Sequence, residues 1–180
     1  MVAERITEFL KVQKVCSSTD YSCFTKGYPK LLNGNVPQWG PNYDIGTNDI
    51  YYRVILADGT SLAFLHWGTS SLWELMWFVV DIDGPNKGKY TFGHDVFMFV
   101  IPKRDHITYE NIENGKLSSY IKNDASATED NFNCFKYGFC SGWILKTGNT
   151  DYFKVDADGN CPNGKKLGYD SSKGKVTKCN

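Results

Sequence analysis

The sequence of 180 residues has no surplus of charge of either sign and no long hydrophobic run. Lys and Arg together number 20, as do Asp and Glu, so the formal net charge at pH 7 is zero. A chain without a basic surplus has little with which to neutralise phosphates, which argues against nucleic acid as a main partner. The longest apolar run, residues 75–80, falls far short of the roughly 20 residues that span a bilayer.

The motifs of the common enzyme classes are also missing. The chain has no Gly-x-Ser-x-Gly elbow, no His-Glu-x-x-His zinc motif and no glycine-rich phosphate loop. Its histidines, His66, His94 and His106, lie in no partnering motif. We interpret His94 and Asp95 as neighbours in a turn, because adjacent strand residues point to opposite faces. The sequence therefore predicts no enzymatic activity.

What the chain does contain indicates one globular domain rich in strands. Its length is typical of a single domain, and 41% hydrophobic residues are enough to build a core. Aromatic residues reach 15%, and 17 glycines accompany them. This combination favours strands joined by turns.

Six cysteines indicate disulfides and an oxidising compartment, because an even number in a small chain is typical of a disulfide framework. The tight Cys-x2-Cys pairs of zinc sites are absent. The simplest pairing is short-range, although sequence alone leaves the other pairings open. It joins Cys16 to Cys23, Cys134 to Cys140 and Cys161 to Cys179. No signal peptide opens the chain, so we expect the export signal to lie upstream of residue 1.

Hydrophobic periodicity predicts an α+β domain, with an amphipathic N-terminal helix packed on an antiparallel sheet with long disulfide-pinned loops. The helix is expected over residues 3–15, because Val2, Ile6, Phe9 and Leu10 fall at helical spacing. Residues 17–49 read as loop. Strands are expected at 50–56, 61–67, 72–82 and 95–101, with shorter ones at 116–121 and 175–178. Residues 142–146 predict a short helix or strand.

Two acidic turns are candidate calcium sites, because an Asp-x-Asp pair brings two carboxylates within reach of one ion. The first contains Asp81, Asp83 and Asn86, with Asp95 further along, and the second contains Asp156, Asp158 and Asn160. Neither turn has the glycine and glutamate positions of an EF-hand loop. The alternative is a structural turn, in which Asp and Asn side chains bond nearby backbone amides.

Three tryptophans are candidates for stacking on a sugar. Trp73 and Trp77 lie four residues apart in an expected strand, which places them on one face, and Trp67 is close in sequence. The alternative for all three is packing in the core.

Four segments resemble, in order, the bacterial type IV pilin-like proteins, also described as prepilin-type or type II secretion pseudopilin proteins. The first is the ADGTS hairpin within residues 52–64, and the second is VVDIDGPNK at 79–87 followed by FGHDVF at 92–97. The third is CSGWILKTGNTDYFK at 140–154, and the last is the loop from Cys161 to Cys179, which the family closes with a disulfide.

The resemblance implies a structural subunit of a type IV pilus or type II secretion pseudopilus, serving assembly, adhesion, motility or secretion. Residues 1–16 would be the end of the long pilin helix, 50–101 the core strands and 134–180 the disulfide-bonded C-terminal region of one domain spanning 1–180. Partners would be other pilin subunits, through the N-terminal helix. The inner membrane would hold an apolar segment expected upstream, before the subunit reaches the cell surface. No cofactor is required, although calcium fits the acidic turns.

Two alternatives come from other functional classes. A secreted lectin-like or adhesive module would use the tryptophans and an acidic turn with calcium. A secreted hydrolase would need a pair of carboxylates about 5–9 Å apart in a deep pocket.

Overall fold

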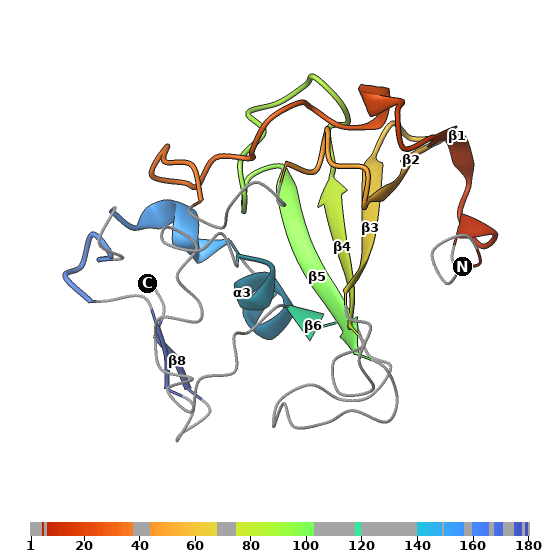
Figure 1. Cartoon of the computed structure of the whole chain (residues 1–180). Helices are drawn as coiled ribbons and strands as arrows, with labels where there is room; N and C mark the ends of the chain where they lie inside the picture. The colour runs from red at the N-terminus through yellow and green to blue at the C-terminus, as the bar shows by residue number, and fades with distance from the viewer. Residues whose placement is uncertain are drawn as a thin grey trace.

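The computed structural model describes residues 5, 7–37, 44–67, 75–102, 118–119, 140–148, 150–156, 160–165, 168–170, 175–177 and 179, and this part of the chain is mostly β. One antiparallel sheet has its strands in the order of the sequence (Figure 1). Its strands are β1 (Val12–Cys16), β2 (Tyr52–Leu56), β3 (Ser61–Trp67), β4 (Leu75–Asp81), β5 (Val96–Pro102) and β6 (Ser118–Ser119). A separate hairpin pairs β7 (Gly168–Asp170) with β8 (Lys175–Thr177).

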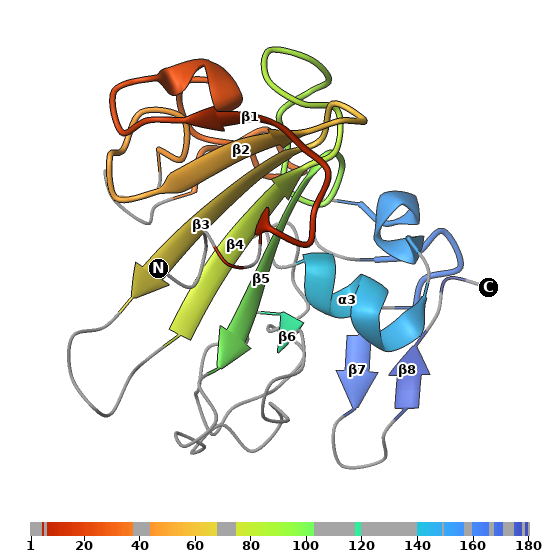
Figure 2. The same cartoon turned by 90° about the vertical axis from the view of Figure 1, so that its right-hand side faces the viewer.

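The described helices are short. The helix α3 (Cys140–Thr147) lies beside β6, near the β7–β8 hairpin (Figure 2), and the 3-10 helices are η1 (Tyr21–Cys23) and η4 (Asp151–Lys154). Gly148 follows α3 with φ of 66°, and its N–H donates to the carbonyl of Ile144 at 2.8 Å. A glycine in the left-handed region is a common end of an α-helix.

The predicted α+β class, with a helix over 3–15, is wrong. Residues 12–16 form β1, and of the described residues before it only Arg5 and Thr7 have helical backbone. Val12 and Val15 are β-branched, and β1 gains ladder hydrogen bonds with β2 that a helix could not make. Tertiary pairing therefore overrides the helical spacing. No helix of the described residues is long and apolar enough to cross a membrane.

The predicted strands of residues 50–101 are present as β2 to β5, and both faces of this sheet are apolar. On one face, Ala63, Leu65, Trp77, Val79 and Met98 form the main core with loop residues such as Phe24 and Phe92. We call the opposite face the aromatic face. It carries buried Val54, Leu62, Phe64 and Met76, with half-buried Leu10, Val12, Tyr52, Leu56, Phe78 and Val80 packed against them.

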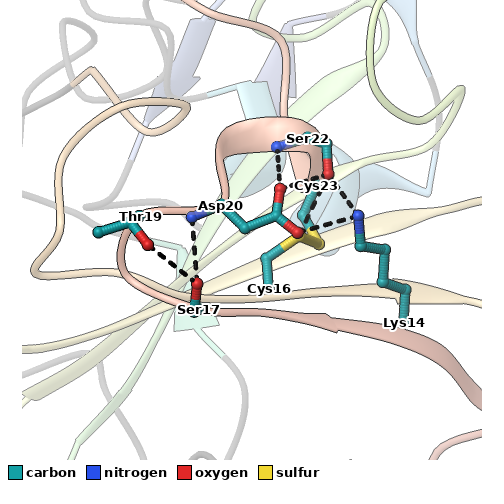
Figure 3. Close-up of polar contacts among 7 residues, drawn as sticks. All are labelled: Lys14, Cys16, Ser17, Thr19, Asp20, Ser22 and Cys23. Carbon is teal, nitrogen blue, oxygen red and sulfur yellow. Dashed lines mark hydrogen bonds and ion pairs between the residues drawn. A yellow bond between two sulfur atoms is a disulfide. The ribbon is translucent and has the colours of Figure 1, made fainter.

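Two of the three predicted disulfides are confirmed, Cys16–Cys23 and Cys161–Cys179. Cys140 is also disulfide-bonded, whereas Cys134 lies outside the described residues. The first bond fastens the end of β1 to η1 (Figure 3). There Asp20 accepts from the backbone N–H of Ser22 at 3.0 Å and pairs with Lys14 at 3.0 Å. Such bonds persist in oxidising compartments, so the chain belongs outside the cytosol.

Candidate functional site: an acidic cluster at the end of the sheet

Strand β4 ends in a fully buried acid. Asp81 is 0% exposed and lies opposite Ser61 of β3, which is also 0% exposed. Directly opposed residues project from the same face of a sheet, so the two side chains are neighbours on the core face. The strand pattern places Asp81 here, because Trp77 and Val79 at alternate positions share that face.

The loop of residues 82–95 folds back over this end of the sheet and is organised by Asp95. The Asp95 carboxylate accepts hydrogen bonds from three consecutive backbone N–H groups, those of Lys89, Tyr90 and Thr91, at 2.5, 2.8 and 2.6 Å. The backbone carbonyl of Asp95 also accepts from Ile82 N–H at 2.9 Å, which closes the loop. Asp95 is therefore committed to holding the loop. His94 and Asp95 lie in a turn, with Nδ1 of His94 3.9 Å from Oδ2 of Asp95.

Gly88 brings a second carboxylate into the cluster. Its φ is 64°, in the region that favours glycine, and a Cβ at this position would collide with carboxylate oxygens of both Asp83 and Asp95. The side chains of Asp83 and Asp95 therefore converge on the backbone of residue 88. We call the buried Asp81 and Asp95, together with the exposed Asp83, the acidic cluster.

Several oxygens in and around the cluster lack partners. Within the described part of the chain, no hydrogen-bond partner is found for Oγ of Ser61 or the hydroxyl of Tyr90. The Asp81 carboxylate makes no hydrogen bond of good geometry there, although the backbone N–H groups of Gly84 and Asp83 face it. Burial, aided by the Asp95 charge, raises the pKa of Asp81 to about 7, although the N–H groups of Gly84 and Asp83 oppose the shift. Burial, followed by the charge of Asp81, raises the pKa of Tyr90. Such a site holds either a proton or a hard cation.

The cluster is not a preformed metal centre. No group of three or more His, Cys, Asp or Glu side chains in the described ranges is arranged to hold a metal ion. This agrees with the use of both Asp95 oxygens by backbone N–H groups. Of the predicted set, Asn86 donates its backbone N–H to Oγ1 of Thr25 at 2.8 Å, which ties the loop to another part of the chain.

The second predicted calcium turn is held by bonds between Asp156 and Asn160 where it is described. Asp156 accepts from the backbone N–H of Asn160 at 2.8 Å, and both of its carboxylate oxygens accept from the Asn160 side-chain amide. Both residues are exposed, and Asp158 lies outside the described residues. This geometry favours the structural alternative for this turn.

The described residues show no sugar-stacking platform built from the candidate tryptophans. Trp77 is only 8% exposed and packs in the main core. Trp67 is described only as part of the β3 backbone, and Trp73 lies outside the described residues. Trp77 therefore serves packing, as the alternative interpretation had it.

Sequence reasoning missed two polar arrangements. The guanidinium of Arg53 is fully buried and donates to four backbone carbonyls. The only signal in the sequence is a charge inside an apolar strand.

The second arrangement is at the surface. Ser22 accepts from Nζ of Lys14 at 2.5 Å and donates to Asp20 at 2.6 Å, which resembles a Ser–Lys dyad. Lys14 also forms an ion pair with Asp20, so the three side chains make up a salt-bridge network at the surface.

Comparison of the chain with protein-family models, curated proteins and solved structures finds no match.

Proposed function

We propose that the chain is the β-rich head of an exported filament subunit of the type IV pilin or pseudopilin class. The ordered segments that resemble this family support the proposal. The disulfides support export, and bonds of this kind typically contribute about 2–4 kcal/mol to a domain exposed to load and proteases.

The observation that carries the proposal is the aromatic face. Tyr52, Phe64, Phe78 and Phe99 lie directly opposite one another on four neighbouring strands. Their ring centroids are 6.4, 6.1 and 5.1 Å apart along the row, which is the range of favourable aromatic pairs. Phe64 is buried, whereas the other three side chains are only half-buried. A row of this kind suits an apolar segment laid across the strands.

The N-terminal segment already contacts this face. Leu10 and Val12 pack against its buried residues. Figure 1 shows the described N-terminal residues on the opposite side of the sheet from α3. Because residues 12–16 form β1, a filament helix that packs on this face has to end before residue 12.

Cell fractionation tests the proposal. Surface material sheared from cells that produce the full-length protein is sedimented at high speed and examined with an antibody to this domain. We expect the protein in the sedimenting fraction, with immunogold label along fibres. A protein found only as dispersed monomer in the medium would contradict the proposal.

The lectin-like alternative has no comparable support. It requires exposed aromatic side chains beside an acidic turn, and Trp77 is buried in the core. Sugar binding remains a prediction to be tested separately.

A further inference from the structure

We propose that the end of the sheet at Asp81 is a calcium site, in which the Asp81 carboxylate anchors the ion. Asp83 supplies a second carboxylate, and the hydroxyls of Ser61 and Tyr90 supply neutral oxygens. The inference does not depend on the proposed filament function.

The first argument is charge. Asp81 is 0% exposed, and no Lys, Arg or His among the described residues forms an ion pair with it. The charges that act on it are the carboxylates of Asp95 and Asp83, which repel it. An isolated buried carboxylate is strongly unfavourable in a folded protein. A bound cation removes both the isolation and the repulsion.

The second argument is the supply of oxygens. Oγ of Ser61 and the Tyr90 hydroxyl are buried without a hydrogen-bond partner in the described part of the structure, and the Asp81 oxygens are faced there only weakly, by the backbone N–H groups of Gly84 and Asp83. Buried polar atoms are almost always paired, so these atoms in one region point to a missing partner. The common chemistry of the four atoms is hard oxygen, which calcium prefers.

The third argument is the position of these groups. Ser61 lies opposite Asp81 in the sheet, and a Cβ on Gly84 would lie 3.9 Å from Oγ of Ser61. The turn that follows Asp81 therefore closes over the serine hydroxyl. Tyr90 belongs to the same loop, and Asp81 is the charge that most affects its hydroxyl.

Asp95 has a different role from the one predicted. Its oxygens accept three backbone N–H groups, so it positions the loop and contributes charge without acting as a ligand. Ser61 and Tyr90 replace Asp95 among the proposed calcium ligands. Calcium bound there would join β3, β4 and the loop of residues 82–95.

Calcium titration of the oxidised chain tests the site. The protein is treated with EDTA, exchanged into metal-free buffer at pH 7.5 and melted with 0 to about 10 mM calcium chloride, the range suited to extracellular calcium modules. At about 100 times the dissociation constant, we expect the melting midpoint to rise by about 5–10 °C. Isothermal titration of the same sample should show binding.

Matched variants locate the ion. D81N should lose the calcium-dependent shift, and S61A should weaken calcium binding by about 3–10-fold. D156N, in the exposed turn of residues 156–160, should behave as the unaltered chain. If D81N fails to fold, S61A decides the test.

Three results would overturn the site. One is the absence of any calcium shift in the unaltered chain. Another is a shift that D81N or S61A retains in full, which would place the ion elsewhere. The last is an equal shift with magnesium chloride, which would show general divalent screening.

Discussion

At the scale of single residues, the most unusual side chain is Arg53, a buried cation that donates to four backbone carbonyls. Its Nη1 donates to Ile45, Gly46 and Asn48 at 3.0 to 3.1 Å, and its Nη2 donates to Ser18 at 3.2 Å. The ring of Tyr21 lies 5.3 Å from the guanidinium carbon. Burial lowers the pKa of Arg53, and the nearby Tyr21 and Asp20 oppose that shift. One side chain thus fastens two loops to β2.

Replacing Arg53 should therefore destabilise the fold strongly. We expect R53M to lower the free energy of unfolding by about 3 kcal/mol, because it leaves four carbonyls without their charged donor. Urea denaturation of the oxidised protein measures the change. The control is K14M, which removes an exposed cation from the neighbouring strand and should cost about 0.5 kcal/mol or less. A cost for R53M no larger than that of K14M would contradict this role.

Asp81 should give the metal-free protein a distinctive pH dependence. Its pKa rises from 3.8 in the unfolded chain to about 7 in the folded one, so the folded state binds the additional proton. This contribution to stability is complete below about pH 4 and is lost as the pH rises towards 7, a fall of roughly 3–4 kcal/mol.

Denaturation in EDTA from pH 4 to 8 measures this fall. The difference between the unaltered chain and D81N isolates it from the other titrating groups, because the asparagine of the D81N variant does not titrate. A difference that stays constant across this range would show that Asp81 titrates normally.

At the scale of elements, the loop of residues 82–95 depends on glycine at position 88. Gly88 and Gly148 have nearly the same φ, 64° and 66°, but a Cβ meets carboxylate oxygens at Gly88 and nothing within 4 Å at Gly148. Both G88A and G148A should cost about 1 kcal/mol of backbone strain. We expect G88A to cost about 1–2 kcal/mol more in urea denaturation, because it also displaces Asp83 and Asp95. Equal losses of unfolding free energy in G88A and G148A would mean that Asp83 and Asp95 move aside without cost.

The strands that could be predicted are those with local signals. The strands β2 and β3 flank an Asp58–Gly59 turn, in which Gly59 has φ of 92° and Thr60 N–H donates to Asp58 at 2.9 Å. The apolar runs of β4 and β5 match strands that carry apolar side chains on both faces. The strand β1 could not be found in this way, because its pairing partner begins 36 residues after its own last residue, at Tyr52.

The candidate site was predictable in part for the same reason. Asp81 and Asp83 stand in one short turn, so their proximity follows from the sequence. Ser61 and Tyr90 come from another strand and from the far side of the loop, and only the sheet register brings Ser61 opposite Asp81. Arg53 was missed because its four acceptors are backbone carbonyls, which leave no trace in side-chain identity.

At the scale of the whole molecule, the two faces of the sheet have different coverings. Loops that include Phe24, Ile45 and Phe92 close the core face, whereas the aromatic face keeps half-buried rings and receives Leu10 and Val12. This asymmetry suits a head that holds its own core on one side and an N-terminal segment on the other.

A substitution on the aromatic face should therefore impair assembly. In cells that make the full-length protein, F78S should reduce the amount of subunit in sheared fibres at least several-fold, because it removes a ring from the centre of the row. The control is F153S, since Phe153 is 48% exposed and lies outside this face. Circular dichroism of the isolated chains checks that both variants fold. Equal incorporation of two folded variants would contradict a role for the face.

Mass spectrometry of the mature N-terminus tests the central claim most directly. The native protein is sheared from its own cells, and its first residues are identified without recombinant processing. The filament account predicts a methylated Phe followed by about 20 apolar residues that lead into residues 3–11 of this sequence. A mature chain that begins near Ala3, or directly after an ordinary secretory cleavage, would contradict the account.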